Sequence, residues 1–174
     1  MAFVAAVLLP TTASAEYYSG GSGTNAFAIY HYPANPTWQS YMNHGPACWN
    51  ATGTGTSISR TTNSSAIKKM QPGTWNTTWT GLYTPSGNRS NRAFLIQLNA
   101  SRITWIRDNY PNSVPFATWA RWTACHEVGH ALSLDDNPSG QTYNTSIMRF
   151  PLTSVTALYT TPRIYDINDV NAFY

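Results

Sequence analysis

The spacing of hydrophobic and polar residues predicts a strand, a helix and a second strand near the start of the chain. Residues 26–32 form a short apolar and aromatic run that a proline ends, which is typical of a strand. A short helix is expected from Trp38 to Trp49, beginning near Thr37. A second strand is expected over residues 56–59, after a glycine-containing turn.

The middle of the chain is rich in Thr, Asn, Ser and Gly and carries weaker patterns. Short strand-like pieces lie around residues 66–70 and 79–83. Residues 94–98 (Phe-Leu-Ile-Gln-Leu) are a stronger strand candidate. The sequence shows no internal repeat and no linker, so its length of 174 residues predicts one domain.

Two further helices are predicted in the second half. The first runs from about Pro115 to Leu134, because proline suits a first helical turn and small apolar residues recur at helical spacing. The last is expected from Asp166 to Tyr174, with Asp166 as its N-cap. The first of these helices contains the most informative residues of the chain.

The first fifteen residues are expected to be a secretory signal peptide. An apolar run at residues 2–9 is followed by the small-residue triplet Ala-Ser-Ala at 13–15, so the mature domain would span residues 16–174. No Lys or Arg precedes the run, which leaves open a start further upstream. A buried N-terminal strand over residues 2–9 is the alternative. No run of eighteen apolar residues follows, so we expect a secreted protein without a membrane anchor.

Composition narrows the range of partners. Charged residues make up 10% of the chain, and the net charge of +3 is scattered, so no basic stripe favours nucleic acid or anionic lipid. Hydrophobic residues make up 42% and aromatic residues 14%, enough for a dense core and for sticky clefts. We therefore expect a monomer that acts on neither nucleic acid nor membranes.

The chain has two cysteines, Cys48 and Cys125. In an oxidising compartment an even number of cysteines usually pairs, which predicts one disulfide. The alternative is that Cys48 is a thiolate that caps an active-site metal in a latent form.

The strongest motif is His126-Glu127-Val128-Gly129-His130, an HExxH sequence inside the predicted central helix. Two histidines four residues apart project from one helix face and can bind a single divalent ion, for which zinc is the natural candidate. Glu127 lies beside them, where its carboxylate can take a proton from an activated water. A solvated polar helix face without any metal is the alternative.

A catalytic zinc needs a third protein ligand. No glutamate follows Glu127 and no histidine follows His130, which excludes sites with a downstream Glu or a third downstream His. Asp136, six residues beyond His130, is the expected ligand if the chain turns back after the helix. The downstream carboxylates are Asp135, Asp136, Asp166 and Asp169.

The spacing His126-Glu127-x-x-His130-x-x-Ser133-x-x-Asp136 resembles the metzincin zinc-binding consensus. It is most similar to the snapalysin branch of small secreted metalloproteases, in which the third ligand is Asp.

Ser133 stands where that family has glycine, a residue suited to the positive φ angle at which the helix ends. Serine is strained in that conformation. If the turn shifts by one residue, Asp135 becomes the ligand instead of Asp136.

The resemblance also implies a methionine turn beneath the metal, for which Met148 is the candidate. Many metzincins carry a tyrosine two residues later, where this chain has Phe150. A phenol that helps to polarise the substrate would have to come from elsewhere, and Tyr143 is a candidate. The implied fold is α+β: a twisted mixed β-sheet packed on an N-terminal helix and the central HExxH helix, followed by the Met-turn and a C-terminal helix.

The expected function is that of a secreted zinc endopeptidase in which Glu127 acts as general base and then general acid. The resemblance implies protein or peptide substrates bound extended along an edge strand of the sheet. Calcium is not expected, because carboxylates are scarce. The rival is a non-catalytic secreted binding module with a structural metal site.

Overall fold

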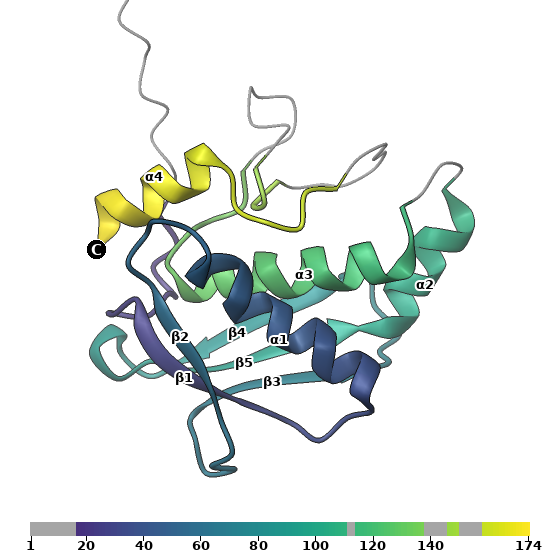
Figure 1. Cartoon of the computed structure of the whole chain (residues 1–174). Helices are drawn as coiled ribbons and strands as arrows, with labels where there is room; N and C mark the ends of the chain where they lie inside the picture. The colour runs from purple at the N-terminus through teal and green to yellow at the C-terminus, as the bar shows by residue number, and fades with distance from the viewer. Residues whose placement is uncertain (1–16, 111–113, 138–145, 150–157) are drawn as a thin grey trace, which may run out of the picture.

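The computed structural model describes residues 17–110, 114–137, 146–149 and 158–174 (Figure 1). The predicted signal peptide, Tyr143 and Phe150 lie outside these residues. The described elements are, in chain order, β1 (Ala26–His31), α1 (Pro36–Asn50), β2 (Ser57–Thr61), β3 (Lys68–Gly73), β4 (Gly81–Ser86), a 3-10 turn (Arg89–Asn91), β5 (Ala93–Asn99), α2 (Ala100–Asn109), α3 (Phe116–Ala131) and α4 (Ile164–Phe173).

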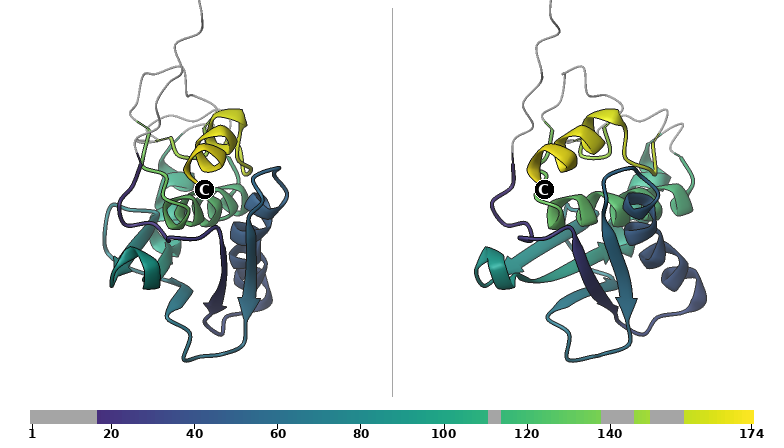
Figure 2. Two further views of the ribbon diagram at one scale, coloured as in Figure 1. Left: turned by 90° about the vertical axis from the view of Figure 1, so that its left-hand side faces the viewer. Right: turned by 60° about the vertical axis from the view of Figure 1, so that its left-hand side comes forward.

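The five strands form one sheet in the order β2-β1-β3-β5-β4. Neighbouring strands are parallel except β4, which pairs antiparallel with β5 and lies at an edge. The sheet is twisted, and α1 and α3 lie side by side on one of its faces (Figure 2). Helix α1 contacts β2 and β3, whereas α3 contacts β4 and β5. The expected α+β architecture is therefore confirmed.

The core lies between the sheet and the two helices. In β5 the alternation of inward and outward residues places Phe94, Ile96 and Leu98 in the interior. From the helices, Trp49 and Trp119 are the largest side chains that are fully buried or nearly so. The Trp49 ring packs against α3, since a Cβ at Gly129 would lie 3.1 Å from it.

A disulfide joins Cys48 of α1 to Cys125 of α3, with 6.2 Å between the Cα atoms. The indole N–H of Trp49 also donates to the Cys125 carbonyl at 2.9 Å. The predicted disulfide is confirmed, and the alternative of a Cys48 thiolate on a metal is wrong. The covalent link lies immediately before His126.

Several boundaries differ from the predictions. Helix α1 begins at Pro36, because Asn35 accepts a hydrogen bond from the Trp38 N–H and acts as the N-cap. Strands β3 and β4 both begin two residues later than expected and extend further. Helix α2 was not predicted, since it follows β5 without an intervening turn sequence.

The prediction that Asp166 caps the last helix is wrong. Helix α4 begins at Ile164, so Asp166 is its third residue, and its carboxylate accepts a hydrogen bond from the Arg163 N–H at 2.7 Å. The Asp166 side chain is buried, so it stabilises the helix start from the interior.

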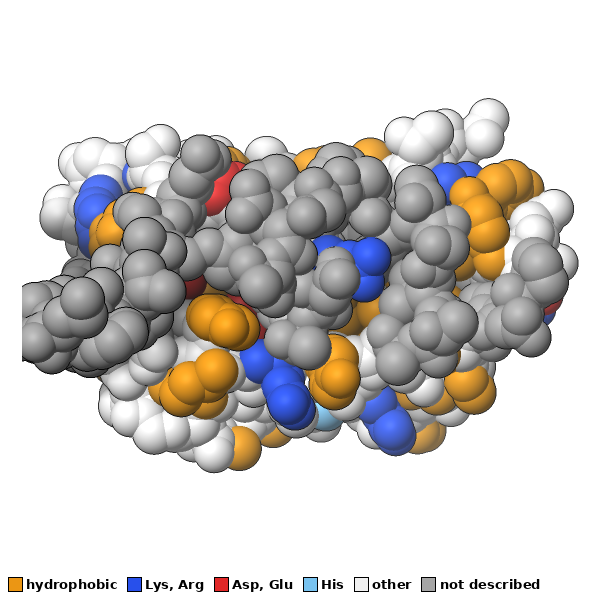
Figure 3. All heavy atoms as spheres, turned by 90° about the horizontal axis from the view of Figure 1, so that it is seen from above, with side chains coloured by type: hydrophobic (Ala, Val, Ile, Leu, Met, Phe, Trp, Pro, Cys, Tyr) orange, Lys and Arg blue, Asp and Glu red, His pale blue; other side chains and the backbone are white. Residues whose placement is uncertain are grey.

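Seen from above, Lys and Arg side chains are separated by hydrophobic and uncharged surface (Figure 3). This agrees with the scattered charge of the sequence. Across the part of the chain that the structure describes, no helix has both the length and the hydropathy required to cross a bilayer.

Candidate metal centre

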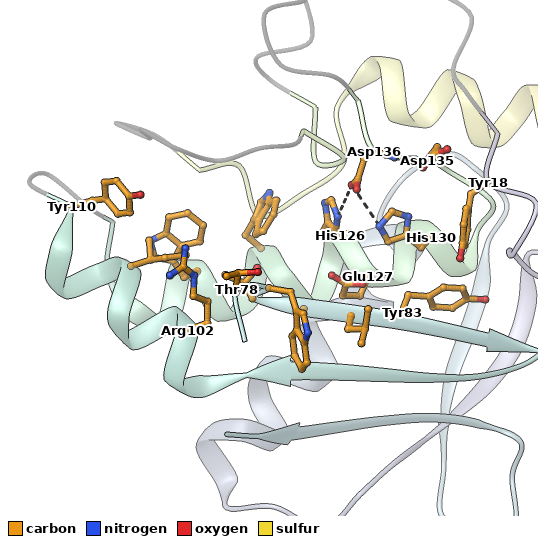
Figure 4. Close-up of a pocket in the computed structure, with 17 residues that line it drawn as sticks. Tyr18, Thr78, Tyr83, Arg102, Tyr110, His126, Glu127, His130, Asp135 and Asp136 are labelled. Atoms are coloured by element: carbon orange, nitrogen blue, oxygen red, sulfur yellow. Dashed lines mark hydrogen bonds and ion pairs between the residues drawn. The ribbon is translucent and has the colours of Figure 1, made fainter. Parts of the chain in front are cut away.

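Two histidines of α3 and one aspartate beyond it converge (Figure 4). Asp136 Oδ1 lies 3.0 Å from His126 Nε2 and 3.6 Å from His130 Nε2. One donor atom from each residue lies within 4.8 Å of the other two, an arrangement that could hold a metal ion. His126 is buried, and the other two side chains are half-buried, so the group opens to one side.

Backbone carbonyls fix the orientation of both imidazole rings. His126 Nδ1 lies 2.9 Å from the Ile147 carbonyl, and His130 Nδ1 lies 2.9 Å from the Leu134 carbonyl. A carbonyl can only accept, so each Nδ1 donates, and each neutral ring carries its lone pair on Nε2. When both rings are neutral, two lone pairs and a carboxylate face one another, a set that fits a divalent cation such as zinc.

The protonation states of His126, His130 and Asp136 depend on one another. Burial acts to lower the pKa of His126, but the Asp136 and Glu127 carboxylates outweigh it and raise the pKa to about 9. Burial, together with the charge on His126, lowers the pKa of His130 to about 4. Burial acts to raise the pKa of Asp136, but the two histidines hold it below its usual range. The Asp136 and Glu127 carboxylates thus favour a positive charge on His126, and that charge disfavours a second one on His130.

The turn after α3 decides which aspartate reaches the histidines. Ser133 adopts a φ of 67°. The N–H of Leu134 donates to the Gly129 carbonyl at 3.1 Å, and that of Ser133 donates to the His130 carbonyl at 3.0 Å, which defines a Schellman motif. The helix therefore ends at the position where the resemblance expects glycine, without a one-residue shift. Asp136 faces the histidines, and Asp135 accepts from the Asp136 N–H at 2.8 Å.

Both described ends of the chain hold Ser133 in this conformation. Its hydroxyl lies 3.3 Å from the Tyr174 hydroxyl and 3.4 Å from the Ser22 carbonyl. The Tyr18 N–H donates to the Ser133 carbonyl at 2.9 Å. Gly21 is required beside it, because a Cβ there would overlap Ser133. These contacts offset the strain of a serine with positive φ.

Glu127 points from α3 toward the edge strand β4. Its carboxylate is buried, and burial raises its pKa to about 7, although His126 and the backbone N–H of Tyr83 act against the rise. Gly81, the first residue of β4, leaves room for it, since a Cβ at that position would overlap Glu127 Oε1. The site thus combines a metal-binding group with a buried carboxylate that lines the same cavity.

Residues 146–148 lie against the same helix. Met148 is buried, and a Cβ on Gly129 would overlap its sulfur, so Met148 packs on the backbone of the HExxH turn. The Met148 carbonyl accepts from the Asn137 N–H at 2.7 Å, which ties this segment to the residue after Asp136.

The metal-binding group opens into a cavity of about 500 Å³. β4 and residues 78–80 form one wall, and α2 and α3 form another. Tyr18 and Arg102 are among the lining residues that were not singled out from the sequence. Tyr18 places its ring 5.5 Å from that of His130, and Arg102 lines the part near α2. Neither has a local sequence signal, because only the tertiary fold brings the two segments to α3.

The sequence matches no protein-family model and no curated protein. Among solved structures it is similar to that of myroilysin, with 10% sequence identity and a TM-score of 0.56, over 92% of this chain and 98% of that chain. At this identity the similarity concerns the fold, and it supports the metzincin-like architecture expected from the sequence.

Proposed function

We propose that this protein is a zinc-dependent endopeptidase. The observation that carries the proposal is the convergence of His126 Nε2, His130 Nε2 and Asp136 Oδ1 beside the buried carboxylate of Glu127. Two imidazole nitrogens and one carboxylate oxygen form a set of three ligands that leaves a coordination position for water or substrate, as in catalytic zinc sites.

When bound, zinc supplies Lewis acidity, which promotes ionisation of a water nucleophile and polarises the peptide carbonyl. Glu127 accepts the proton of the attacking water and passes it to the leaving amine. Its position suits both transfers, because the carboxylate is buried and lines the same cavity as the metal-binding group.

β4 offers a template for the substrate backbone. It pairs with β5 along one edge only, and residues 81–83 line the cavity along the other. An extended peptide added to this edge would lie antiparallel or parallel to β4 and pass beside Glu127. In the same proposal, Met148 forms the apolar floor of the metal site, and the Tyr18 phenol stands at one end of the cleft.

We further propose that the enzyme is secreted, that residues 1–15 are its signal peptide, and that residues 16–174 form its catalytic domain. The Cys48–Cys125 disulfide supports an oxidising compartment. The snapalysin-like ligand set, with Asp136 as third ligand, is part of this proposal.

The test is digestion of casein and of a peptide library by purified mature protein, with chelator, and with zinc restored after chelation. Chelator-sensitive cleavage that zinc restores is expected, and Glu127→Gln should abolish it while zinc remains bound. Stoichiometric zinc without hydrolysis of any substrate would instead favour a binding module with a structural metal.

A further inference from the structure

The cavity continues well beyond the metal-binding group. From His126 it follows α3 toward its N-terminus, where Trp122 and then Trp119 line it. Trp119 lies seven positions before His126, which is about 10 Å along a helix. Ile106 and Tyr110 of the α2 region complete this part, which we term the α2 recess, with largely apolar walls.

Among the described residues, one cation lines the α2 recess, the guanidinium of Arg102. Its planar group lies over the Trp105 ring, 4.1 Å from the ring centre. Nε is buried and has no hydrogen-bond partner among the described residues. No carboxylate of the described chain forms an ion pair with Arg102, whereas Arg107 of the same helix is paired with Asp108 at 2.6 Å.

The carboxylates that line the cavity lie elsewhere. Glu127, Asp135 and Asp136 belong to the metal-binding end (Figure 4), whereas Arg102 lies at the opposite end. Arg102 is half-buried, and leaving its buried Nε–H without a partner has a desolvation cost. A ligand that brings an anionic oxygen to the α2 recess would remove that cost.

The position of Arg102 in its helix increases the effect. It is the third residue of α2, where the positive end of the helix dipole disfavours a cation and favours an anion. Asn99, the N-cap residue, makes no capping hydrogen bond. Its side chain instead bonds the loop of residues 75–79, for example at 3.0 Å to the Trp75 carbonyl. The side-chain cap that could neutralise this end is therefore missing.

We propose that Arg102 makes the enzyme selective for substrates with a glutamate within two residues of the cleaved bond. The inference rests on the proposed peptidase function. The apolar walls would contact the methylene groups of the glutamate, and the guanidinium fork would bind its carboxylate through parallel N–H···O bonds. An aromatic substrate side chain would fill the walls and leave Arg102 without an acceptor.

The experiment compares peptides that are identical except for Glu, Gln or Phe at each position within two residues of the cut. At the preferred position, the wild-type kcat/KM for Glu should exceed that for Gln about tenfold or more, as one charge-assisted pair allows. Arg102→Gln should reduce this ratio to about one. Arg102→Lys should retain part of the preference, because it keeps the charge and loses the fork.

Arg107→Gln is the matched control, since Arg107 lies on the same helix but is exposed and already paired. It should keep the wild-type ratio. Hydrolysis with equal rates for Glu and Gln in the wild type, or an unchanged ratio in Arg102→Gln, would overturn the inference.

A binding measurement separates this inference from the proposed function. Tryptophan fluorescence of zinc-loaded Glu127→Gln should report tighter binding of the Glu peptide than of the Gln peptide, and Arg102→Gln in that background should remove the difference. If the wild type cleaves nothing, the peptidase proposal fails. The fluorescence measurement then still shows whether the α2 recess binds a carboxylate. Equal affinity for the Glu and Gln peptides would refute the inference about Arg102.

Discussion

The Asp166 carboxylate accepts a hydrogen bond from the Ile147 N–H at 3.1 Å, and the Ile147 carbonyl lies 2.9 Å from Nδ1 of His126. Asp166 also accepts from the Ser146 hydroxyl at 2.5 Å. A buried residue of α4 therefore fixes the segment that orients a candidate metal ligand on α3. Such partners beyond the ligands set both the tautomer and the position of an imidazole.

Replacing Asp166 should therefore weaken metal binding without removing a ligand. The carboxylate accepts from the Ser146 hydroxyl and the Ile147 N–H, whereas the amide group of Asp166→Asn has only one oxygen that can accept. The turn at residues 146–147 should therefore loosen. We expect zinc affinity to fall about 10- to 100-fold, measured by competition with a chromophoric chelator. Asp169→Asn, on the same helix, is the control and should retain wild-type affinity. Equal affinity in Asp166→Asn would show that α4 does not support the site.

The third ligand can be identified by comparing neighbouring aspartates. Asp136→Ala removes the carboxylate that lies 3.0 Å from His126 Nε2, so the purified protein should lose its stoichiometric zinc. Asp135→Ala should keep it, because the Asp135 carboxylate accepts from the Asp136 backbone instead of facing both histidines. Elemental analysis after gel filtration measures this. The reverse pattern would assign the ligand to Asp135.

Gly81 provides a test of the general base that leaves the ligands intact. A Cβ at Gly81 would overlap the carboxylate of Glu127, so Gly81→Ala should displace that group. A shift of about 1 Å in a catalytic group can cost about 100-fold in rate, so kcat should fall by roughly that factor with zinc content unchanged. Gly53→Ala is the matched control, because a Cβ there meets nothing within 4 Å. Full activity in Gly81→Ala would argue against Glu127 as the base.

The pH dependence of stability should contain a contribution from Asp169. Burial raises the pKa of Asp169 to about 6, and the nearby Asp166 carboxylate adds to the rise. The folded state thus binds this proton more tightly than the unfolded state. The resulting stabilisation of the fold is fully present below pH 4 and is lost as the pH rises from about 4 to 6.

Asp169→Asn imitates the protonated form at every pH. It should therefore raise Tm by a few degrees at pH 7 and leave it unchanged near pH 3.5, as thermal unfolding followed by circular dichroism would show. The gain is limited, because the half-exposed carboxyl is partly screened by solvent. A difference that grows toward acid pH would contradict the assignment.

Local sequence was sufficient for some features. The HExxH motif and the apolar stripe of α3 lie within one helix, so their mutual geometry follows from helical spacing alone. The strands β1 and β5 were also recognised from local sequence, because their apolar patterns are continuous.

Features that depend on distant residues were not decided by the sequence. The choice between Asp135 and Asp136 depends on the conformation of Ser133, which Tyr174 and Ser22 stabilise from far along the chain. Helix α2 was missed because it begins at Ala100, directly after the last residue of β5, with no turn sequence between them.

The disulfide immediately before His126 links the stability of the candidate metal site to the redox state of the two cysteines. It closes a loop across 77 residues of sequence separation, and in the chain-entropy model such a bond stabilises the fold by roughly 4 kcal/mol. A chain that still carries thiols lacks this contribution at the helix that bears the candidate ligands. Reduction of the Cys48–Cys125 bond should therefore destabilise the candidate site together with the fold.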